Sequence, residues 1–226
     1  IAALNGSTAP FEGKKLGDID GCVFAFTSPS PETRELLAAR EIPTIVINRM
    51  DDELACVVND HTHGMRALAA HIASRRPGAR PAFLSVRTAL PVAEYRWRAF
   101  REQDALAVGD EDRFELGSIA EIDASFVADL LDGGYETIVC VNDLVAVAVH
   151  DRLASLGRRV PEEVGLTGYD AAPVRGLLAR AITTVDLAGE DLGRVAAERL
   201  VEAILNRARP AGCTTIPGAF IPGESL

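Results

Sequence analysis

The sequence predicts an α/β fold built around mostly parallel sheets, and the order of its apolar segments carries that prediction. Short runs rich in β-branched residues alternate with longer stretches of helical period from about residue 18 to the C-terminal region. This alternation is typical of repeated strand–helix–strand units around a parallel sheet. With 226 residues, the chain can bury a substantial core, either in one large domain or in two small ones.

Five short apolar runs after the N-terminal region are predicted as strands. They are rich in Val, Ile and Phe and are bounded by residues that favour turns, which is the pattern of strands buried in a sheet. The predicted strands are Gly21 to Phe26, Thr44 to Ile47, Ala82 to Val86, Thr137 to Val141 and Val164 to Tyr169.

Three longer stretches are predicted as helices that each bury one face: His61 to Ser74, Asp143 to Leu156, and Asp191 to Asn206. Each repeats apolar residues at the spacing of one helical face. Gly157 and Pro210 follow the second and third stretches and are expected to end those helices. The residues expected to face the core are Met65, Leu68, Ala69, Ile72, Val145, Val149, Leu153, Leu156, Leu192, Val195, Ala196 and Leu200.

The N-terminal region departs from this pattern. Ile1 to Leu4 is a plausible strand, but no stretch long enough for a crossover helix lies between it and the strand that begins at Gly21. A parallel crossover usually needs about a dozen residues or more. The start of the fold is therefore predicted to be abbreviated.

Composition excludes several classes of function. The hydrophobic share is 48%, the charged share is 25%, and the formal net charge is −10. Phosphate binding needs clustered Lys and Arg, so this charge argues against a nucleic-acid surface on the chain. No apolar run approaches the roughly 20 residues of a membrane span, and nothing resembles a signal peptide. The chain is therefore expected to be cytoplasmic and without membrane contact.

The four cysteines are Cys22, Cys56, Cys140 and Cys213. They lie far apart, form no CxxC pair and mostly fall within apolar, strand-like runs. Cysteines in such surroundings are usually buried and reduced, so four free thiols are expected.

Polar residues at the ends of three predicted strands are the candidate binding groups. PTIVIN ends at Asn48, TIVCVN at Asn142 and VGLTGYD at Asp170, while Arg96 follows the strand that ends at Val86. Ligands of open parallel sheets bind outside the carboxyl ends of the strands. Amide, carboxylate and guanidinium groups there suit a polyhydroxylated or amide-rich ligand. The alternative is that Asn and Asp only cap helices and begin turns.

Neither a metal site nor a catalytic site has positive support in the sequence. His61 and His63 with Asp60 could be metal ligands, but side chains two positions apart on a helix point to different sides. The chain has no GxSxG elbow, P-loop or GxGxxG segment. Cys140 and His150 remain a possible pair, although a cysteine in a Val-rich strand is usually part of a core. We therefore expect no catalytic residue, metal or cofactor.

Longer motifs resemble a known family. The segment NDLVAVAVHDRLASLGRRVPEEVGLTGYD, followed by AITTVDLAGEDLGRVAAERLVEAI, closely resembles the C-terminal half of the effector-binding domain of LacI/GalR-family bacterial transcription regulators. INR at 47–49, VVNDHTHGMRALAAHI, the pair Arg96 and Phe100, and the ending IPGAFIPGESL fit the same pattern in the same order. The resemblance covers about residues 18 to 226, and its motifs are specific as a set.

The resemblance implies a periplasmic-binding-protein-like fold of type I. Such a fold has two doubly wound parallel-sheet subdomains, joined by three crossover strands, with an effector in the cleft between them. The implied N-terminal subdomain is 1–60 and 186–212, and the C-terminal one is 61–185 and 213–226. Asn48, Arg96, Asn142 and Asp170 then fall on positions that line the effector cleft in the family, and Arg87 and Ile119 are two further candidates.

The resemblance also implies partners. Family members carry an N-terminal helix-turn-helix and a hinge helix that bind an operator, and neither pattern occurs in this sequence. The implied full protein is a homodimeric repressor that contacts operator DNA only through a domain outside this chain. Effector binding would shift the two subdomains, a population shift limited by the difference in affinity for the two states.

Several departures from the family bear on the ligand. Ala148, Ala171 and Ala181 replace a usual Gly, an acidic residue and a Pro. The loop after Val86 reads RTALPVAEY where sugar-responsive members have small polar residues, and Ile119 stands where an aromatic often stacks on the ligand. A sugar remains the favoured effector, and a nucleobase-like ligand remains open.

Two other functions compete with an effector-sensing domain. A periplasmic solute-binding protein of a sugar transport system would share the fold, and a signal peptide upstream would favour it, whereas an upstream helix-turn-helix would exclude it. An α/β enzyme such as a hydrolase would be indicated by turnover that depends on Asp170.

Overall fold

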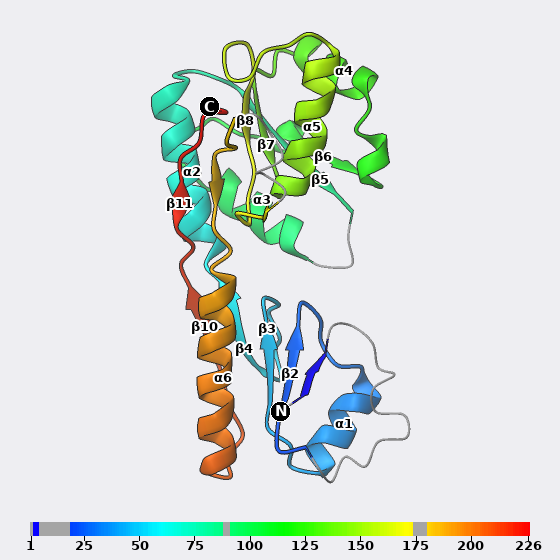
Figure 1. The fold of residues 1–226 in the computed structure, drawn as a ribbon, viewed down its shortest axis with the longest axis vertical. Coiled ribbons are helices and arrows are strands. Elements are labelled where there is room, and N and C mark those ends of the chain that lie inside the picture. Colours follow the sequence, from blue (N-terminus) through cyan, green and yellow to red (C-terminus); the bar gives the residue numbers. More distant parts are fainter. Residues whose placement is uncertain (1, 5–18, 88–90, 174–179) are drawn as a thin grey trace. The chain divides into compact units, whose positions relative to one another are not determined.

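The structure, a computed structural model, describes residues 2–4, 19–87, 91–173 and 180–226. It divides into two compact units, each with its own parallel sheet (Figure 1). Unit 1 comprises Ile1–Asp60 and Ala188–Ile216, and unit 2 comprises His61–Leu187 and Pro217–Leu226. The chain therefore passes from one unit to the other three times.

Unit 1 contains a five-stranded sheet in which every neighbouring pair is parallel. The strand order is β1-β2-β3-β4-β10, so the strand that arrives last in the sequence lies at one edge, beside β4. The strands are β1 (Ala2–Leu4), β2 (Cys22–Ala25), β3 (Thr44–Ile47), β4 (Ala55–Asn59) and β10 (Cys213–Ile216).

Helices cover both faces of this sheet. Helix α1 (Pro31–Ala39) begins after Ser30, whose hydroxyl accepts a hydrogen bond from the Thr33 backbone N–H, and its Leu37 packs against the core residues Cys22, Phe24, Val46, Cys56 and Val58. Helix α6 (Gly189–Leu205) packs on β3 and β4 and buries Leu192, Ala196, Leu200 and Ala203. Because side chains alternate along a strand, Val46 and its neighbour Ile45 face opposite helices.

Unit 2 contains a four-stranded parallel sheet with the order β6-β5-β7-β8. Its strands are β5 (Pro81–Val86), β6 (Arg113–Leu116), β7 (Thr137–Cys140) and β8 (Gly165–Thr167). A separate two-stranded antiparallel ribbon pairs β9 (Thr184–Val185) with β11 (Phe220–Ile221).

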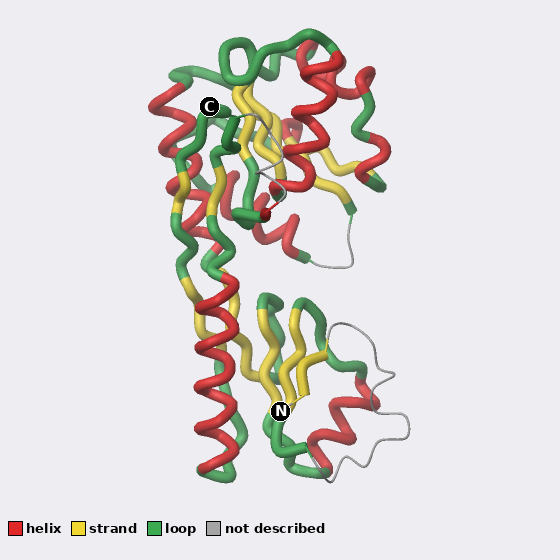
Figure 2. Tube along the Cα trace, in the orientation of Figure 1, coloured by secondary structure: helices red, strands yellow, loops and turns green. Residues whose placement is uncertain are grey.

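Among the described residues, unit 2 also has four helices and two short 3₁₀ turns, and they alternate with the strands along the chain (Figure 2). Its hydrophobic core joins the fully buried β5 and β7 to the apolar faces of the helices. The helices are α2 (His61–Arg75), α3 (Val92–Arg101), α4 (Ala124–Asp132) and α5 (Asp143–Ser155), and the 3₁₀ turns are η3 (Asp110–Asp112) and η4 (Ile119–Glu121).

The predicted α/β class with two parallel sheets is confirmed, and the predicted strands and helices lie within a few residues of those observed. Gly157 ends α5 with a left-handed φ of 70°, as its position predicts. The expected inward face of this helix was wrong at Leu156, which is 36% exposed because it lies beyond the last helical turn. The shortened crossover predicted after β1 falls on residues 5–18, outside the described residues.

Two further expectations were wrong. Residues 213–226 were assigned to the second subdomain, but β10 pairs with β4, so 213–216 belong to unit 1. Four free thiols were expected, but the same pairing sets Cys213 directly opposite Cys56, and the two form a disulfide. Cys22 and Cys140 are free and buried, as predicted.

No helix among the described residues is long and apolar enough to cross a membrane.

A buried carboxylate, Asp143, joins the strand ends of unit 2. It is the first residue of α5, and its Oδ1 accepts a hydrogen bond of 2.7 Å from the Thr184 hydroxyl, while its Oδ2 accepts one of 2.7 Å from the Ala172 N–H. Its own backbone N–H donates to the Tyr169 carbonyl at 2.8 Å. Gly168 is required beside it, since a Cβ there would collide with Asp143 Oδ1. Asp143 thus fixes the turn that follows β8.

Replacing Asp143 with Ala is expected to destabilise unit 2. The change leaves the buried Thr184 hydroxyl and the Ala172 N–H without this acceptor, and each such loss costs about 1 to 3 kcal/mol. Urea unfolding followed by circular dichroism should therefore show a loss of about 2 to 5 kcal/mol in the free energy of unfolding.

The matched control is Asp151→Ala, which removes an exposed carboxylate from the same helix. It should change the free energy of unfolding by less than about 0.5 kcal/mol. Equal losses in the two variants would contradict the role assigned to Asp143.

Candidate functional site

The carboxyl ends of β5, β7 and β8 define the candidate site in unit 2. Val141 and Asn142 follow β7, and Tyr169 and Asp170 lie two and three residues beyond the end of β8. Helix α3, which comes after β5, contributes Arg96. Because these strands are parallel and adjacent, their carboxyl ends lie on one edge of the sheet.

An ion pair between Arg96 and Asp170 forms the centre of the site. The Arg96 side chain is only 2% exposed, and its Nη2 lies 2.6 Å from Asp170 Oδ1. Its Nη1 donates a 2.6 Å hydrogen bond to the Val141 carbonyl, and its guanidinium carbon lies 3.8 Å from the centre of the Tyr169 ring. The Asp170 side chain remains 28% exposed. A fixed guanidinium thus orients a carboxylate that still has room to accept hydrogen bonds from a ligand.

The backbone that carries Asp170 is held in an uncommon conformation. Asp170 and Ala171 have φ values of 96° and 51°, a left-handed region that favours glycine. The Asp170 N–H donates to the Val185 carbonyl at 2.8 Å, and the N–H of Ala172, two residues after Asp170, donates to the Asp143 carboxylate. Non-glycine residues persist in such conformations where the surroundings fix them, often at functional sites.

Asn142 serves as the N-cap of α5. Its Oδ1 accepts a 2.9 Å hydrogen bond from the Val145 N–H. Asn142 therefore does cap a helix, the alternative role that the sequence left open, and it does so through its amide oxygen. The cap uses one lone pair of Oδ1 and leaves the amide nitrogen, a hydrogen-bond donor, outside this interaction.

His61 and Tyr95 extend the aromatic surroundings of Arg96. The His61 ring lies 5.9 Å from the Tyr169 ring and 6.1 Å from the Tyr95 ring. Burial, with a further contribution from the positive charge of Arg96, lowers the pKa of His61 to about 3. His61 is therefore neutral at physiological pH. Among the described residues, no group of three His, Cys, Asp or Glu side chains is arranged to hold a metal ion.

Asn48 belongs to unit 1, where it follows β3. Its backbone N–H donates to the Val57 carbonyl at 2.8 Å, and its φ of 54° is left-handed. Its side-chain Oδ1 is buried and has no hydrogen-bond partner among the residues that the structure describes. A buried acceptor without a partner is uncommon in proteins. The Asn48 Oδ1 is therefore available to accept a hydrogen bond from a donor that the described residues do not supply.

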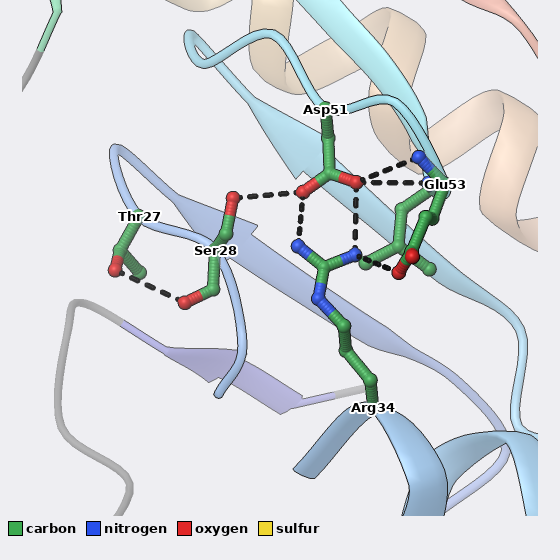
Figure 3. A network of polar contacts seen from close by, with 6 residues as sticks. Thr27, Ser28, Arg34, Asp51 and Glu53 are labelled. Atoms are coloured by element: carbon green, nitrogen blue, oxygen red, sulfur yellow. Dashed lines mark hydrogen bonds and ion pairs between the residues drawn. The ribbon is translucent and has the colours of Figure 1, made fainter. Parts of the chain in front are cut away.

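An ionic network holds the loop after Asn48 in place (Figure 3). Asp51 accepts hydrogen bonds from both terminal nitrogens of Arg34 and one of 2.8 Å from the Ser28 hydroxyl. Burial alone would raise the pKa of Asp51, but the hydrogen bonds from Arg34, Ser28 and two backbone N–H groups outweigh it and hold that pKa well below its ordinary value. The network joins the loops that follow β2 and β3 to the first turn of α1.

The two remaining candidates lie in different surroundings. Arg87 directly follows β5, its side chain is 72% exposed, and its Nε lies 3.4 Å from Glu115 Oε1. Ile119 lies in η4 and packs, partly buried, against the hydrophobic core of unit 2. The adjoining segment 88–90 is outside the described residues. A role for either residue in ligand binding stays a prediction.

Sequence reasoning thus found part of this arrangement. The structure brings Arg96 and Asp170 into direct contact, with Asn142 next to the carbonyl that Arg96 also binds. The sequence did not identify Tyr169 as the surface beneath Arg96, nor Asp143 as the support of the Asp170 turn. The spacing of Asp143 and Gly168 carried no signal, because their contact depends on the pairing of distant strands.

The partly buried His61 should make the stability of the protein depend on pH. Its folded pKa of about 3 lies below the unfolded value of 6.5, so below pH 6.5 the unfolded chain takes up a proton that the folded chain does not. Stability should fall as the pH drops from about 7 toward 3, by about 1.4 kcal/mol per pH unit from this group. His61→Gln should remove that component in urea unfolding at pH 7.5 and 5.

His71→Gln provides the control for this measurement. Burial and the positive charge of Arg75 also lower the pKa of His71, but by less than the pKa of His61 is lowered, so its replacement should alter the pH dependence far less. Identical pH profiles for the wild type and His61→Gln would contradict the assignment.

Comparisons with known proteins agree with this geometry. A family described as periplasmic binding protein-like domain matches residues 61–226. The ribose operon repressor of Bacillus subtilis (strain 168) is 26% identical over 210 residues, which cover 92% of this chain and 63% of the relative. The transcriptional repressor PurR of Vibrio cholerae is 25% identical over 196 residues, which cover 84% and 58%. The chain therefore spans about three fifths of the length of these relatives.

Solved structures share the fold. A LacI-family regulator from Enterococcus faecium with bound ribose superposes with a TM-score of 0.76 at 20% identity, covering 91% of this chain and 79% of the other. A LacI-family regulatory protein from Chloroflexus aggregans gives 0.79 at 20% identity, covering 92% and 77%. The predicted periplasmic-binding-protein-like fold is thereby confirmed. The chain belongs to the family of periplasmic-binding-protein-like domains, and the curated relatives named above, to which it is similar, are transcriptional repressors.

Proposed function

We propose that this chain is the effector-sensing domain of a LacI-type transcription regulator and that it binds a small polyhydroxylated molecule, with a sugar favoured. The observation that supports this most is the Arg96–Asp170 pair, a buried guanidinium that orients a partly exposed carboxylate. The curated relatives named above are transcriptional repressors, so the proposed role is binding without chemical conversion.

The polarity of the groups favours hydroxyl-bearing ligands. An ionised Asp170 only accepts hydrogen bonds, whereas the amide nitrogen of Asn142 donates them. A hydroxyl group can serve both, since it donates and accepts. Structural relatives include one with bound ribose and one described as a cellobiose complex. A nucleobase, with ring N–H donors and carbonyl acceptors, would meet the same requirement, and the relatives also include PurR.

Asn48 is proposed as a ligand-binding residue of unit 1. The resemblance to LacI/GalR regulators assigns it that role, and its unpartnered Oδ1 is consistent with an acceptor that a ligand hydroxyl would satisfy. An effector that binds one state of the domain more tightly than another would favour that state. The response would then be a population shift set by the difference in ligand affinity between the states.

Operator DNA is proposed to be contacted by another part of the full regulator, acting as a homodimer in the cytoplasm. The formal charge of −10 on this chain is consistent with that division, because DNA binding requires clustered positive charge. The alternative of a periplasmic solute-binding protein is not favoured, since the curated relatives named above are transcriptional repressors.

The proposal is tested by ligand binding to Asp170→Asn. A thermal-shift screen of pentoses, hexoses, disaccharides and purine bases first identifies the ligand, because a molecule that binds only the folded state raises its melting temperature. Calorimetry should then show affinity about 10- to 100-fold weaker in the variant, since a hydrogen bond to a charged group contributes about 1.5 to 3 kcal/mol.

Asp132→Asn is the matched control, because it alters an exposed carboxylate at the end of α4 in the same unit. It should bind as the wild type does. Equal affinity of the wild type and Asp170→Asn would remove Asp170 from the site, and the lack of any ligand among sugars and purines would overturn the proposed ligand class.

A further inference from the structure

The disulfide between Cys56 and Cys213 lies in the parallel ladder of β4 and β10. The two residues are direct partners across the ladder, with Cα atoms 4.5 Å apart, although 157 residues separate them in the sequence. Cys56 is fully buried, whereas Cys213 is exposed at the edge of the sheet. One sulfur of the bond therefore belongs to a residue that solvent and small thiols can reach.

We propose that the Cys56–Cys213 bond is a redox-sensitive crosslink, which fixes the edge strand β10 onto β4 and which dithiols open in the folded protein. In one respect this inference rests on the proposed function. A DNA-binding regulator works among thiol reductants that keep most cysteines reduced, and disulfides that form there are usually transient or redox-sensing.

The exchange is a two-electron, two-proton reduction by a dithiol. A thiolate of the reductant attacks the sulfur of Cys213, forms a mixed disulfide with it, and releases Cys56 as a thiolate that takes up a proton. The second thiol of the reductant then attacks the reductant sulfur that is bonded to Cys213. This step releases Cys213 as a thiolate, which takes up a proton. The products are two cysteine thiols and the cyclic disulfide of the reductant. Attack at Cys213 is favoured because Cys56 is buried.

The crosslink holds a strand that has few other attachments in the sheet. β10 pairs with β4 alone, and its last residue, Ile216, accepts a 2.8 Å hydrogen bond from the Asp60 N–H. Both strands end where the chain leaves unit 1, after Asp60 and after Ile216. Two of the three passages between the units therefore emerge directly from the ladder that the disulfide closes.

Arg199 on α6 keeps the two cysteines close when the bond is open. Its Nη1 donates to the Cys56 carbonyl at 3.1 Å and to the Thr214 hydroxyl at 2.9 Å, and its Nη2 donates to the Ala211 carbonyl at 2.6 Å. These bonds join β4 to the start of β10 without involving sulfur. The reduced strand is thus looser but still placed for reoxidation.

The other two cysteines provide an internal reference. Cys22 and Cys140 are buried and free, and burial raises the pKa of both thiols, which lowers the fraction of reactive thiolate. They should remain thiols under conditions that open and close the Cys56–Cys213 bond.

The first test counts thiols in the 226-residue chain. After treatment of the folded protein with oxidised glutathione, denaturing alkylation and mass spectrometry should find two modified cysteines, Cys22 and Cys140. After treatment of the folded protein with dithiothreitol, all four should be modified. Four thiols in the oxidised sample, or only two after dithiothreitol, would overturn the proposal. The count does not depend on any ligand, so it stays readable if the proposed effector site is wrong.

The second test follows β10 by amide hydrogen exchange. Reduction should lower protection at residues 214–216 by roughly tenfold or more, because the strand loses its covalent attachment and opens more often. It should also lower the melting temperature by several degrees, since the long loop between the cysteines is freed in the unfolded chain.

Two variants complete this second test. Cys213→Ser should show the low protection with or without reductant, whereas Cys22→Ala, which keeps the disulfide, should respond as the wild type does. Equal protection of residues 214–216 in the oxidised and reduced wild type would show that the bond does not control β10, and it would overturn that part of the proposal.

Discussion

Arg96 holds a positive charge in surroundings that are almost fully closed to water, and a charge in such a place is costly unless its N–H groups find acceptors. One acceptor is the Val141 carbonyl at the end of β7, and the other is the Asp170 carboxylate beyond the end of β8. Both exist only when the two strands are paired in their observed register and α3 packs beside them. The sheet of unit 2 therefore supplies the acceptors that stabilise the buried charge of Arg96, and Arg96 in turn fixes the position of Asp170.

Unit 1 uses the same kind of interaction for a different purpose. There the buried acid is Asp51, and Arg34 and Ser28 come from the segments that follow the neighbouring strand. The result is a fixed loop after β3, immediately beyond Asn48. In both units, an arginine and an aspartate link loops at the carboxyl ends of parallel strands. In unit 2 the ion pair includes Asp170, a proposed ligand-binding residue, whereas in unit 1 the ion pair holds the loop beside Asn48.

Local patterns predicted the fold class and the elements with the clearest composition and period, such as strand Thr44–Ile47 and helix α5. They did not predict helices α1, α3 and α4 or the short strands β4, β6, β9, β10 and β11. Residues at strand ends also indicated Arg96, Asn142 and Asp170. The sequence could not reveal interactions between distant segments: Asp143 with Thr184, or Cys56 with Cys213, whose pairing requires that β10 return beside β4. Asn142 shows an intermediate case, since capping and ligand binding favour the same residue type and only the structure shows which atom the cap uses.

The three passages of the chain between the units have a consequence for biosynthesis. Unit 1 gains its edge strand only with residues 213–216, and unit 2 gains β11 and the buried Leu226 from the residues after them. The Leu166 N–H, in the middle of β8, donates to the Ser225 carbonyl at 2.7 Å. Neither unit can complete its hydrogen bonding until residues 213–226 have left the ribosome. Both should therefore reach their final stability together, once this segment has been synthesised, rather than one after the other as in chains whose domains are continuous.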